Sequence, residues 1–259
     1  MNNQGDDTLA ARLARAWQDG TQIDAPTPEC APADAKAAFA VQHELLAKLG
    51  AGIGGWKVGA KSADGPIQGA PLPIGLPIGG CLPGGVRLAR RTYAPLGLEL
   101  EIAFRFGRVF EPRDAAYPAD EVQAAIGMMA ATIEIVASRY LGWPKVDKLA
   151  QLADLQNHGA LVIGEAVPYR GDFAFGSPSL RFRFDDDSIA GDARPVNPAG
   201  DPRRLLPWLV NHSTQTRRIA VTPDMTVTTG SYSGMFFPDR AGVVRGTIDG
   251  LPPVSLELF

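Results

Sequence analysis

Apolar and polar positions alternate strictly from residue 97 to residue 106, which reads Gly-Leu-Glu-Leu-Glu-Ile-Ala-Phe-Arg-Phe. The leucines, the isoleucine and the phenylalanines fall on one face of an extended chain, and the residues between them fall on the other. This period predicts a β-strand over 96–106. Its polar face carries Glu99 and Glu101, two positions apart. Such a pair is either part of a solvated outer face or a pair of oxygen ligands held side by side on a rigid element.

The N-terminal part of the chain shows the helical period instead. Residues 6–19 place apolar side chains at four-residue spacing, and Gly20 follows as a stop signal. After a proline-rich link at 23–32, a second helix with one apolar stripe ends at Gly50. We expect a helical N-terminal portion over residues 1–60 that leads into the core.

The chain contains 29 Gly and 22 Pro, which is typical of a β-rich fold with short strands and many turns. Residues 65–86 alone hold seven Gly and five Pro, a composition that favours neither a helix nor a central strand. We therefore predict a Gly/Pro-rich loop over 61–90 and expect it to act as a lid beside the functional site.

Residues 91–259 are predicted to form a β-rich catalytic domain. Asp and Glu at the start of 120–129 favour a helix there, and Asp-Pro at 201–202 begins a second helix that runs to about residue 217. The remaining alternating segments predict strands at 132–137, 180–184, 218–222, 225–229, 242–248 and 254–258.

Composition excludes several classes of protein. At 259 residues, 45% apolar and 20% charged, the chain can bury the core of one large globular domain. A net charge of −3 gives no basic surface for nucleic acid. No apolar run approaches the roughly 20 residues that span a bilayer, and the polar N-terminus is not a signal peptide. The only two cysteines, Cys30 and Cys81, have no metal-binding spacing, so we expect a cytoplasmic protein.

Further candidates for chemistry lie outside the alternating strand. Lys57 stands between Trp and Val in Gly-Trp-Lys-Val-Gly, and it either points to solvent or points inward and meets an anion. Glu134 stands between two isoleucines, where a carboxylate is costly to bury unless it is paired or ligating. Asp154, Asn157 and His158 are equally suited to proton transfer and to a helix cap or turn.

Five motifs in chain order together resemble the fumarylacetoacetate hydrolase superfamily: Gly-Trp-Lys-Val-Gly at 55–59, Glu-x-Glu at 99–101, Ile-Glu-Ile-Val-Ala-Ser-Arg at 133–139, Ala-Asp at 153–154 and Thr-Gly-Ser at 229–231. Within it the chain is most similar to 2-keto-4-pentenoate (2-hydroxypenta-2,4-dienoate) hydratases and 4-oxalocrotonate decarboxylases. The resemblance implies an α+β fold, a mixed β-sandwich or roll with helices outside. It also implies a homo-oligomer.

The resemblance implies that Glu99, Glu101 and Glu134 ligate one divalent cation, usually Mg²⁺ or Mn²⁺. The chemistry agrees, because three carboxylates without His or Cys form a hard oxygen set that suits these ions. A 2-oxo acid or its enol would chelate the cation, which would stabilise a metal-bound enolate.

Roles for other residues follow from the same resemblance. Lys57 would pair with the substrate carboxylate or assist proton transfer, and Asp154 would orient water or a neighbouring group. Gly230 and Ser231 would bind the carboxylate end of the substrate. Asn157 and His158 stand where the family carries small hydroxyl residues, so these two would have to take part in proton transfer in their place.

A second departure lies at 71–75. The family commonly has Pro-Asp-Phe-Gly between the lysine and the metal strand, and its Asp helps catalysis, whereas this chain reads Pro-Leu-Pro-Ile-Gly without an acid. The metal set is therefore complete in the sequence, and the proton-transfer set is altered.

Three functions remain open from the sequence. The first is a hydratase that adds water to a 2-hydroxy-2,4-dienoate and gives a 4-hydroxy-2-oxo acid. The second is a 2-oxo acid decarboxylase or an acylpyruvate-type C–C hydrolase on the same scaffold. The third is a non-catalytic partner subunit for a family decarboxylase.

Overall fold

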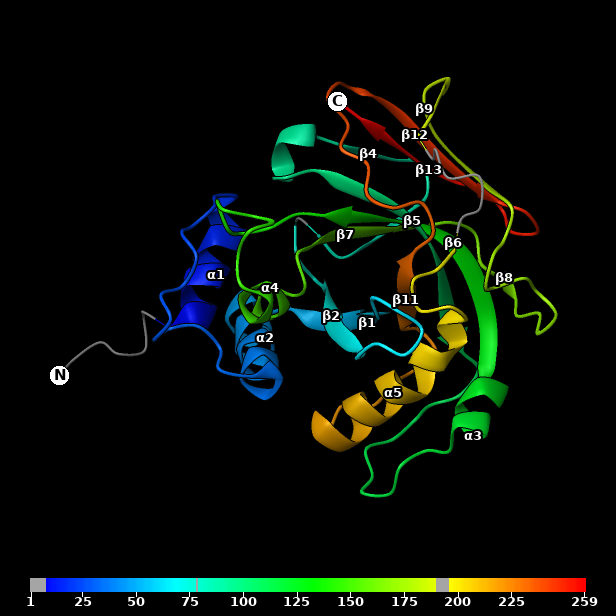
Figure 1. Cartoon of the computed structure of the whole chain (residues 1–259), viewed down its shortest axis with the longest axis horizontal. Helices are drawn as coiled ribbons and strands as arrows, with labels where there is room; N and C mark the ends of the chain where they lie inside the picture. The colour runs from blue at the N-terminus through cyan, green and yellow to red at the C-terminus, as the bar shows by residue number, and fades with distance from the viewer. Residues whose placement is uncertain (1–7, 78, 190–195) are drawn as a thin grey trace.

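Two β-sheets form the body of the molecule, and the helices pack against the larger one (Figure 1). The computed structural model describes residues 8–77, 79–189 and 196–259. In spatial order the larger sheet contains β2 (Gln68–Ile74), β1 (Gly52–Gly59), β11 (Thr226–Ser231), β5 (Gly97–Phe106), β6 (Ile126–Val136), β7 (His158–Ile163) and β3 (Cys81–Pro83), and β8 (Val167–Pro168) pairs with β6. The smaller sheet contains β10 (Asp187–Ser188), β9 (Leu180–Phe184), β12 (Gly242–Ile248), β13 (Val254–Leu258) and β4 (Val86–Leu88).

Both sheets are mixed. β1 pairs with β11, β3 with β7 and β4 with β13 in parallel, and the other strand pairs are antiparallel. Together with the helices outside, this arrangement confirms the predicted α+β fold class.

β5 and β6 are the two longest strands and lie side by side at the centre of the larger sheet. Their register runs from Gly97 opposite Val136 to Phe106 opposite Ile126. The apolar residues of β5 alternate into the main core and are almost fully buried, namely Leu98, Leu100, Ile102, Phe104 and Phe106. The strand predicted over 96–106 is therefore confirmed, and its polar positions face away from that core.

The helical N-terminal portion contains α1 (Leu9–Asp19) and α2 (Ala35–Leu49). Each helix begins at a side-chain cap, Thr8 or Asp34, and ends at a left-handed glycine, Gly20 or Gly50, as the stop signals predict. With α4 (Lys148–Ala153) they enclose a second apolar cluster, whose buried members include Leu13, Trp17, Leu45, Leu46 and Leu152. Residues 6 and 7 of the first predicted helix lie outside the described residues.

A further helical region lies between β10 and β11. The helix predicted from 201 is a short helical turn, η2 (Pro202–Arg204), followed by α5 (Leu205–Asn211) and a wider turn, η3 (His212–Thr216). A further short turn, η1 (Arg90–Thr92), precedes β5. None of the helices described here has both the length and the apolarity needed to cross a membrane.

The stretch 65–86 differs from the predicted continuous loop, because it contains β2 and β3. β2 includes Pro71 and Pro73 and still pairs antiparallel with β1. It lies at the edge of the larger sheet, where a residue without a backbone N–H is tolerated on the unpaired side. The sequence excluded a central strand correctly, but an edge strand was missed.

The helix predicted at 120–129 is shorter than expected. α3 (Ala119–Ala124) ends early, and β6 begins at Ile126. Ile126 and Met129 continue the helical spacing of Val122 and Ala125, which predicts helix up to 129, but residues 126–129 pair instead with the end of β5. Tertiary pairing therefore overrides local propensity here. The strand predicted at 218–222 is reduced to a single bridge between Val221 and Phe110.

Candidate active site

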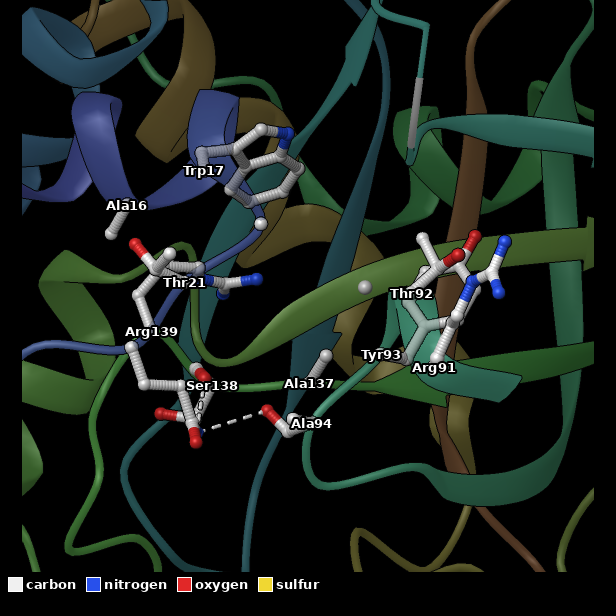
Figure 2. Close-up of a pocket in the computed structure, with 13 residues that line it drawn as sticks. Ala16, Trp17, Thr21, Arg91, Thr92, Tyr93, Ala94, Ala137, Ser138 and Arg139 are labelled. Carbon is white, nitrogen blue, oxygen red and sulfur yellow. Dashed lines mark hydrogen bonds between the residues drawn. The ribbon is translucent and has the colours of Figure 1, made fainter. Parts of the chain in front are cut away.

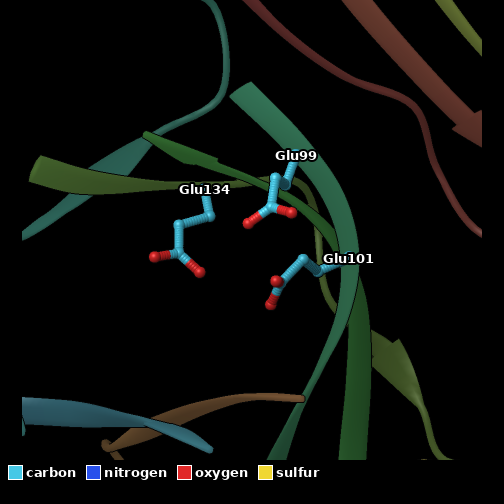
Figure 3. Close-up of side chains that lie close together, drawn as sticks. All are labelled: Glu99, Glu101 and Glu134. Carbon is cyan, nitrogen blue, oxygen red and sulfur yellow. The ribbon is translucent and has the colours of Figure 1, made fainter. Parts of the chain in front are cut away.

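The three predicted metal ligands converge on one point (Figure 3). Glu99 and Glu101 project from the same face of β5, and Glu134 of β6 lies directly opposite Glu99 in the strand register. One carboxylate oxygen from each lies within 4.8 Å of the others. The sheet register therefore accounts for the cluster.

Glu101 is the most firmly held of the three. It is 2% exposed and accepts hydrogen bonds from the Thr228 hydroxyl and from the Gly230 N–H, the latter at 3.1 Å. The register of β11 shifts between Thr228 and Ser231, and Gly230 adopts a φ of 92° at this irregularity. A left-handed φ favours glycine, so the Thr-Gly-Ser motif supplies the backbone shape that directs an N–H at the carboxylate.

Lys57 points inward and lies against the carboxylate cluster. It is 8% exposed, and its Nζ forms an ion pair with Glu134 and donates to the Gln156 carbonyl at 3.0 Å. Of the two orientations left open by the sequence, the structure has the one in which the ammonium meets an anion.

The cluster carries more negative charge than its protein surroundings neutralise. Burial, and after it the charge of Glu134, raises the pKa of Glu99 to about 7, with an opposing contribution from Lys57. The same two causes raise the pKa of Glu101 well above its usual value. Three carboxylates, two buried and that of Glu99 half-buried, share one lysine and form an oxygen set that a divalent cation would stabilise. The residues present therefore fit one hard divalent ion, and the expected cofactor site is confirmed in its geometry.

A cavity of about 750 Å³ opens beside the cluster. Lys57, Gly230, Ser231 and Asn157 line it together with the three glutamates. The cavity wall thus combines the carboxylate oxygens of the three glutamates with the Lys57 ammonium, and a small anionic molecule fits there.

Asp154 does not lie on this cavity wall. It is fully buried, and its carboxylate accepts hydrogen bonds from the backbone N–H and the side-chain Nε of Arg139, at 2.9 and 2.6 Å. Arg139 also donates to the backbone carbonyls of Asp154 and His158. The Ala-Asp motif therefore anchors the chain after β6, and the structure gives Asp154 no access to the cavity.

His158 is also outside the wall. Its ring is fully buried, and burial followed by the charge of Lys57 lowers its pKa well below the usual value. Asn157 does line the cavity, but its amide donates to Gln151 Oε1 at 3.2 Å. Residues 155–157 have φ values of 45°, 56° and 58°, a left-handed turn between α4 and β7. Of the four predicted catalytic residues, the structure brings Lys57 and Asn157 to the cavity.

A second, smaller pocket lies between α1 and the segments around residues 92 and 138 (Figure 2). Trp17, Thr21, Arg91, Tyr93 and Ser138 are among its lining residues. Its volume of about 50 Å³ is on the scale of a water molecule or two. No carboxylate lines it among the described residues, so it lacks the chemistry of the larger cavity.

Several residues at the larger cavity were missed in the sequence. Thr228 was not singled out, although its hydroxyl donates a hydrogen bond to Glu101. Trp143, Gln151 and Met235 line the cavity. They come from a loop, a short helix and a second loop, and no local period links them.

Comparison with known proteins identifies the fold. No family model matches the chain, and no curated protein matches it. Among solved structures, the chain is similar to 4-oxalocrotonate decarboxylase from Pseudomonas putida G7, with a TM-score of 0.79 and 18% identity over 97% of this chain and 96% of that one. That enzyme was solved with calcium and acetate and with magnesium and adipate.

Two further structures are more distant. 2-Hydroxyhepta-2,4-diene-1,7-dioate isomerase from Mycobacterium marinum has a TM-score of 0.55 and 16% identity over 80% of this chain and 76% of that one. Fumarylpyruvate hydrolase from Pseudomonas aeruginosa, in complex with Mn²⁺ and pyruvate, has a TM-score of 0.51 and 16% identity over 78% and 88%. The chain therefore has the fold of the fumarylacetoacetate hydrolase superfamily, and the resemblance predicted from its motifs is confirmed at that level.

Proposed function

We propose that this protein is a divalent-metal-dependent enzyme that hydrates a 2-hydroxy-2,4-dienoate to a 4-hydroxy-2-oxo acid. The observation that carries the proposal is the convergence of Glu99, Glu101 and Glu134 at the end of a cavity that also exposes Lys57. A divalent cation held there supplies Lewis acidity, which favours negative charge on the 2-oxygen of a bound 2-oxo acid.

The chain's own residues bind and orient the substrate in this proposal. Lys57 is held by Glu134 and the Gln156 carbonyl, so its positive charge has a fixed position beside the ligand cluster. Ser231 lies on the same wall, and its hydroxyl is a hydrogen-bond donor for a carboxylate, whereas Gly230 lines the wall with its N–H directed at Glu101. We assign these groups to the carboxylate end of the substrate.

A 2-oxo acid decarboxylase is the second candidate. Two observations favour it: the similarity in fold to 4-oxalocrotonate decarboxylase, and the positions of Asp154 and His158 away from the cavity. Hydration needs a directed water molecule and proton transfer, whereas loss of carbon dioxide needs mainly an acceptor for the electron pair left on carbon.

An ultraviolet assay separates these candidates. Purified protein is mixed with freshly generated 2-hydroxypenta-2,4-dienoate, with and without Mg²⁺ or Mn²⁺. We expect metal-dependent loss of the dienol and formation of 4-hydroxy-2-oxopentanoate. No loss of dienol, together with metal-dependent release of carbon dioxide from 4-oxalocrotonate, would replace hydratase with decarboxylase. No turnover of either substrate by the purified protein alone would contradict an enzymatic function.

A further inference from the structure

We infer that the cavity has an apolar subsite beside the carboxylate cluster, lined by Val136, Trp143 and Met235 with Gly97 beneath Met235, which binds an uncharged apolar group at the far end of the substrate. We call these four residues the distal subsite. The inference rests on the proposed function, because it assumes that a 2-oxo acid is anchored at the cluster. It adds the substrate class: a monocarboxylic 2-oxo acid with a hydrocarbon tail.

The strand register places the distal subsite relative to the cluster. Glu99 lies opposite Glu134, and two residues further along the same face Gly97 lies opposite Val136. Residues two apart in a strand are separated by roughly 7 Å. At roughly 1.5 Å per C–C bond, a substrate chain that follows the strands reaches this pair after about five bonds. The subsite therefore lies beyond the carboxylate and the reacting carbons.

Glycine at position 97 allows Met235 to lie directly over β5. A Cβ added to Gly97 would come within 2.8 Å of Met235 Sδ and 3.3 Å of Val136 Cβ. The neighbouring backbone holds Met235 in place, because Leu98 and Phe236 exchange two hydrogen bonds of 2.8 and 2.9 Å. Met235 lines the cavity and remains 37% exposed. An adaptable thioether over a bare backbone forms an apolar surface for a hydrocarbon chain.

Trp143 forms the other side of the subsite, and hydrogen bonds from Gln151 hold the loop that follows it. Gln151 Nε2 donates to the carbonyls of Pro144 and Val146, at 3.2 and 2.7 Å, just after Trp143. Gln151 Oε1 then accepts from Asn157. Gln151 therefore holds the loop that follows Trp143, and Asn157 donates to Gln151, so the aromatic wall is pre-formed.

The charges around the subsite disfavour a second carboxylate. Lys57 is already paired with Glu134. Among the described wall residues the other cations are Lys61 and Lys148, and both are exposed. A carboxylate against Val136 and Trp143 would lose its hydration without gaining a cationic partner, and the unpaired Nε1 of Trp143 is itself buried, so this placement is unfavourable. An uncharged tail avoids this cost.

Binding of three ligands to the Mg²⁺-loaded protein tests the inference by calorimetry. Pyruvate reports the anchor alone, 2-oxoheptanoate adds an apolar tail, and 2-oxoadipate adds a tail that ends in a carboxylate. We expect 2-oxoheptanoate to bind at least tenfold more tightly than pyruvate, and 2-oxoadipate to gain no such advantage. Equal affinities for pyruvate and 2-oxoheptanoate, or tighter binding of 2-oxoadipate, would overturn the inference. If pyruvate does not bind in a metal-dependent way, the proposed function itself fails.

Variants test which residues give 2-oxoheptanoate its higher affinity. Met235→Lys should remove the advantage of 2-oxoheptanoate over pyruvate and improve 2-oxoadipate relative to both. Trp143→Leu should reduce the same advantage without adding charge, which provides a second measurement should the lysine variant fold poorly. Val243→Lys is the matched control, since Val243 is 39% exposed on the smaller sheet, and it should leave all three affinities unchanged. A loss of 2-oxoadipate binding in Lys148→Met, with tight binding in the wild type, would instead establish a dicarboxylate substrate.

Discussion

The two sides of the cavity are built in different ways. On the sheet side, Glu99, Glu101 and Glu134 come from β5 and β6, which pair along ten positions at the centre of the larger sheet. On the loop side, the segments around Trp143 and Asn157 are held by individual hydrogen bonds and by the buried ion pair of Arg139 and Asp154. Backbone pairing thus positions the three glutamates, whereas side-chain contacts position the loop walls of the cavity.

This difference predicts different consequences of mutation. A substitution among the glutamates removes a ligand from a scaffold that the strands continue to hold. A substitution in the loop anchors releases a segment of chain, so its first effect is on folding stability. The following experiments test this division.

The largest effect is expected on the sheet side. Glu99→Gln should reduce turnover at least ~1000-fold, on the order of 4 kcal/mol, because one metal ligand is lost. The metal-free variant should melt no lower than the wild type, since a buried and repelling charge is removed. Steady-state kinetics and thermal unfolding check both parts. Retained Mg²⁺-dependent turnover would refute Glu99 as a ligand, and Glu257→Gln on the smaller sheet is the control.

The next largest effect is expected at a loop anchor. Asp154→Ala should destabilise the protein by about 3–5 kcal/mol, because it leaves the Arg139 guanidinium buried without its carboxylate. Asp114→Ala breaks an exposed pair with Arg218 and should cost about 0–1 kcal/mol. Urea unfolding compares the two. An Asp154 variant of normal stability that lacks activity would instead make Asp154 a catalytic group.

Lys57 contacts both sides of the cavity, because its ammonium pairs with Glu134 and donates to the Gln156 carbonyl. The Lys57→Met variant removes both contacts. At saturating Mg²⁺ we expect KM for the substrate to rise about 10- to 100-fold, roughly 1–3 kcal/mol, with a smaller change in kcat. Substrate titrations of variant and wild type measure this. Unchanged KM would remove Lys57 from substrate binding.

The smallest effect is a pH dependence of metal binding. Protons compete with the cation for Glu99, whose pKa is raised to about 7 by burial and by the neighbouring Glu134. Affinity for Mg²⁺ should therefore fall by up to about tenfold per pH unit below pH 7. Titrations at pH 6 and pH 8 are sufficient, and equal affinities would show that Glu99 is already ionised at pH 6.

The same division explains what the sequence could predict. The period of β5, the caps of α1 and α2 and the lone glutamate at 134 are local signals, so α1, α2 and the central strand were predicted correctly, and the three glutamates singled out in the sequence do converge. The early start of β6 and the edge strand β2 depend on pairing with distant strands, which no local pattern records.

The loop side was least predictable. Asp154 and His158 have the residue types of a proton-transfer set, but whether such residues reach a cavity depends on partners far away in sequence. Arg139 forms an ion pair with the carboxylate of Asp154, and His158 is fully buried. The distal subsite joins residues from positions 97, 136, 143 and 235, which only the folded chain brings together.

The central claim is that the sheet side holds one divalent cation. Calorimetric titration of the metal-free protein with Mn²⁺, beside the Glu101→Gln variant, tests it most directly. We predict one ion per chain for the wild type, and a loss of affinity of at least a hundredfold in the variant with its fold retained. Absence of binding in the wild type, or equal affinity in the two proteins, would contradict the account.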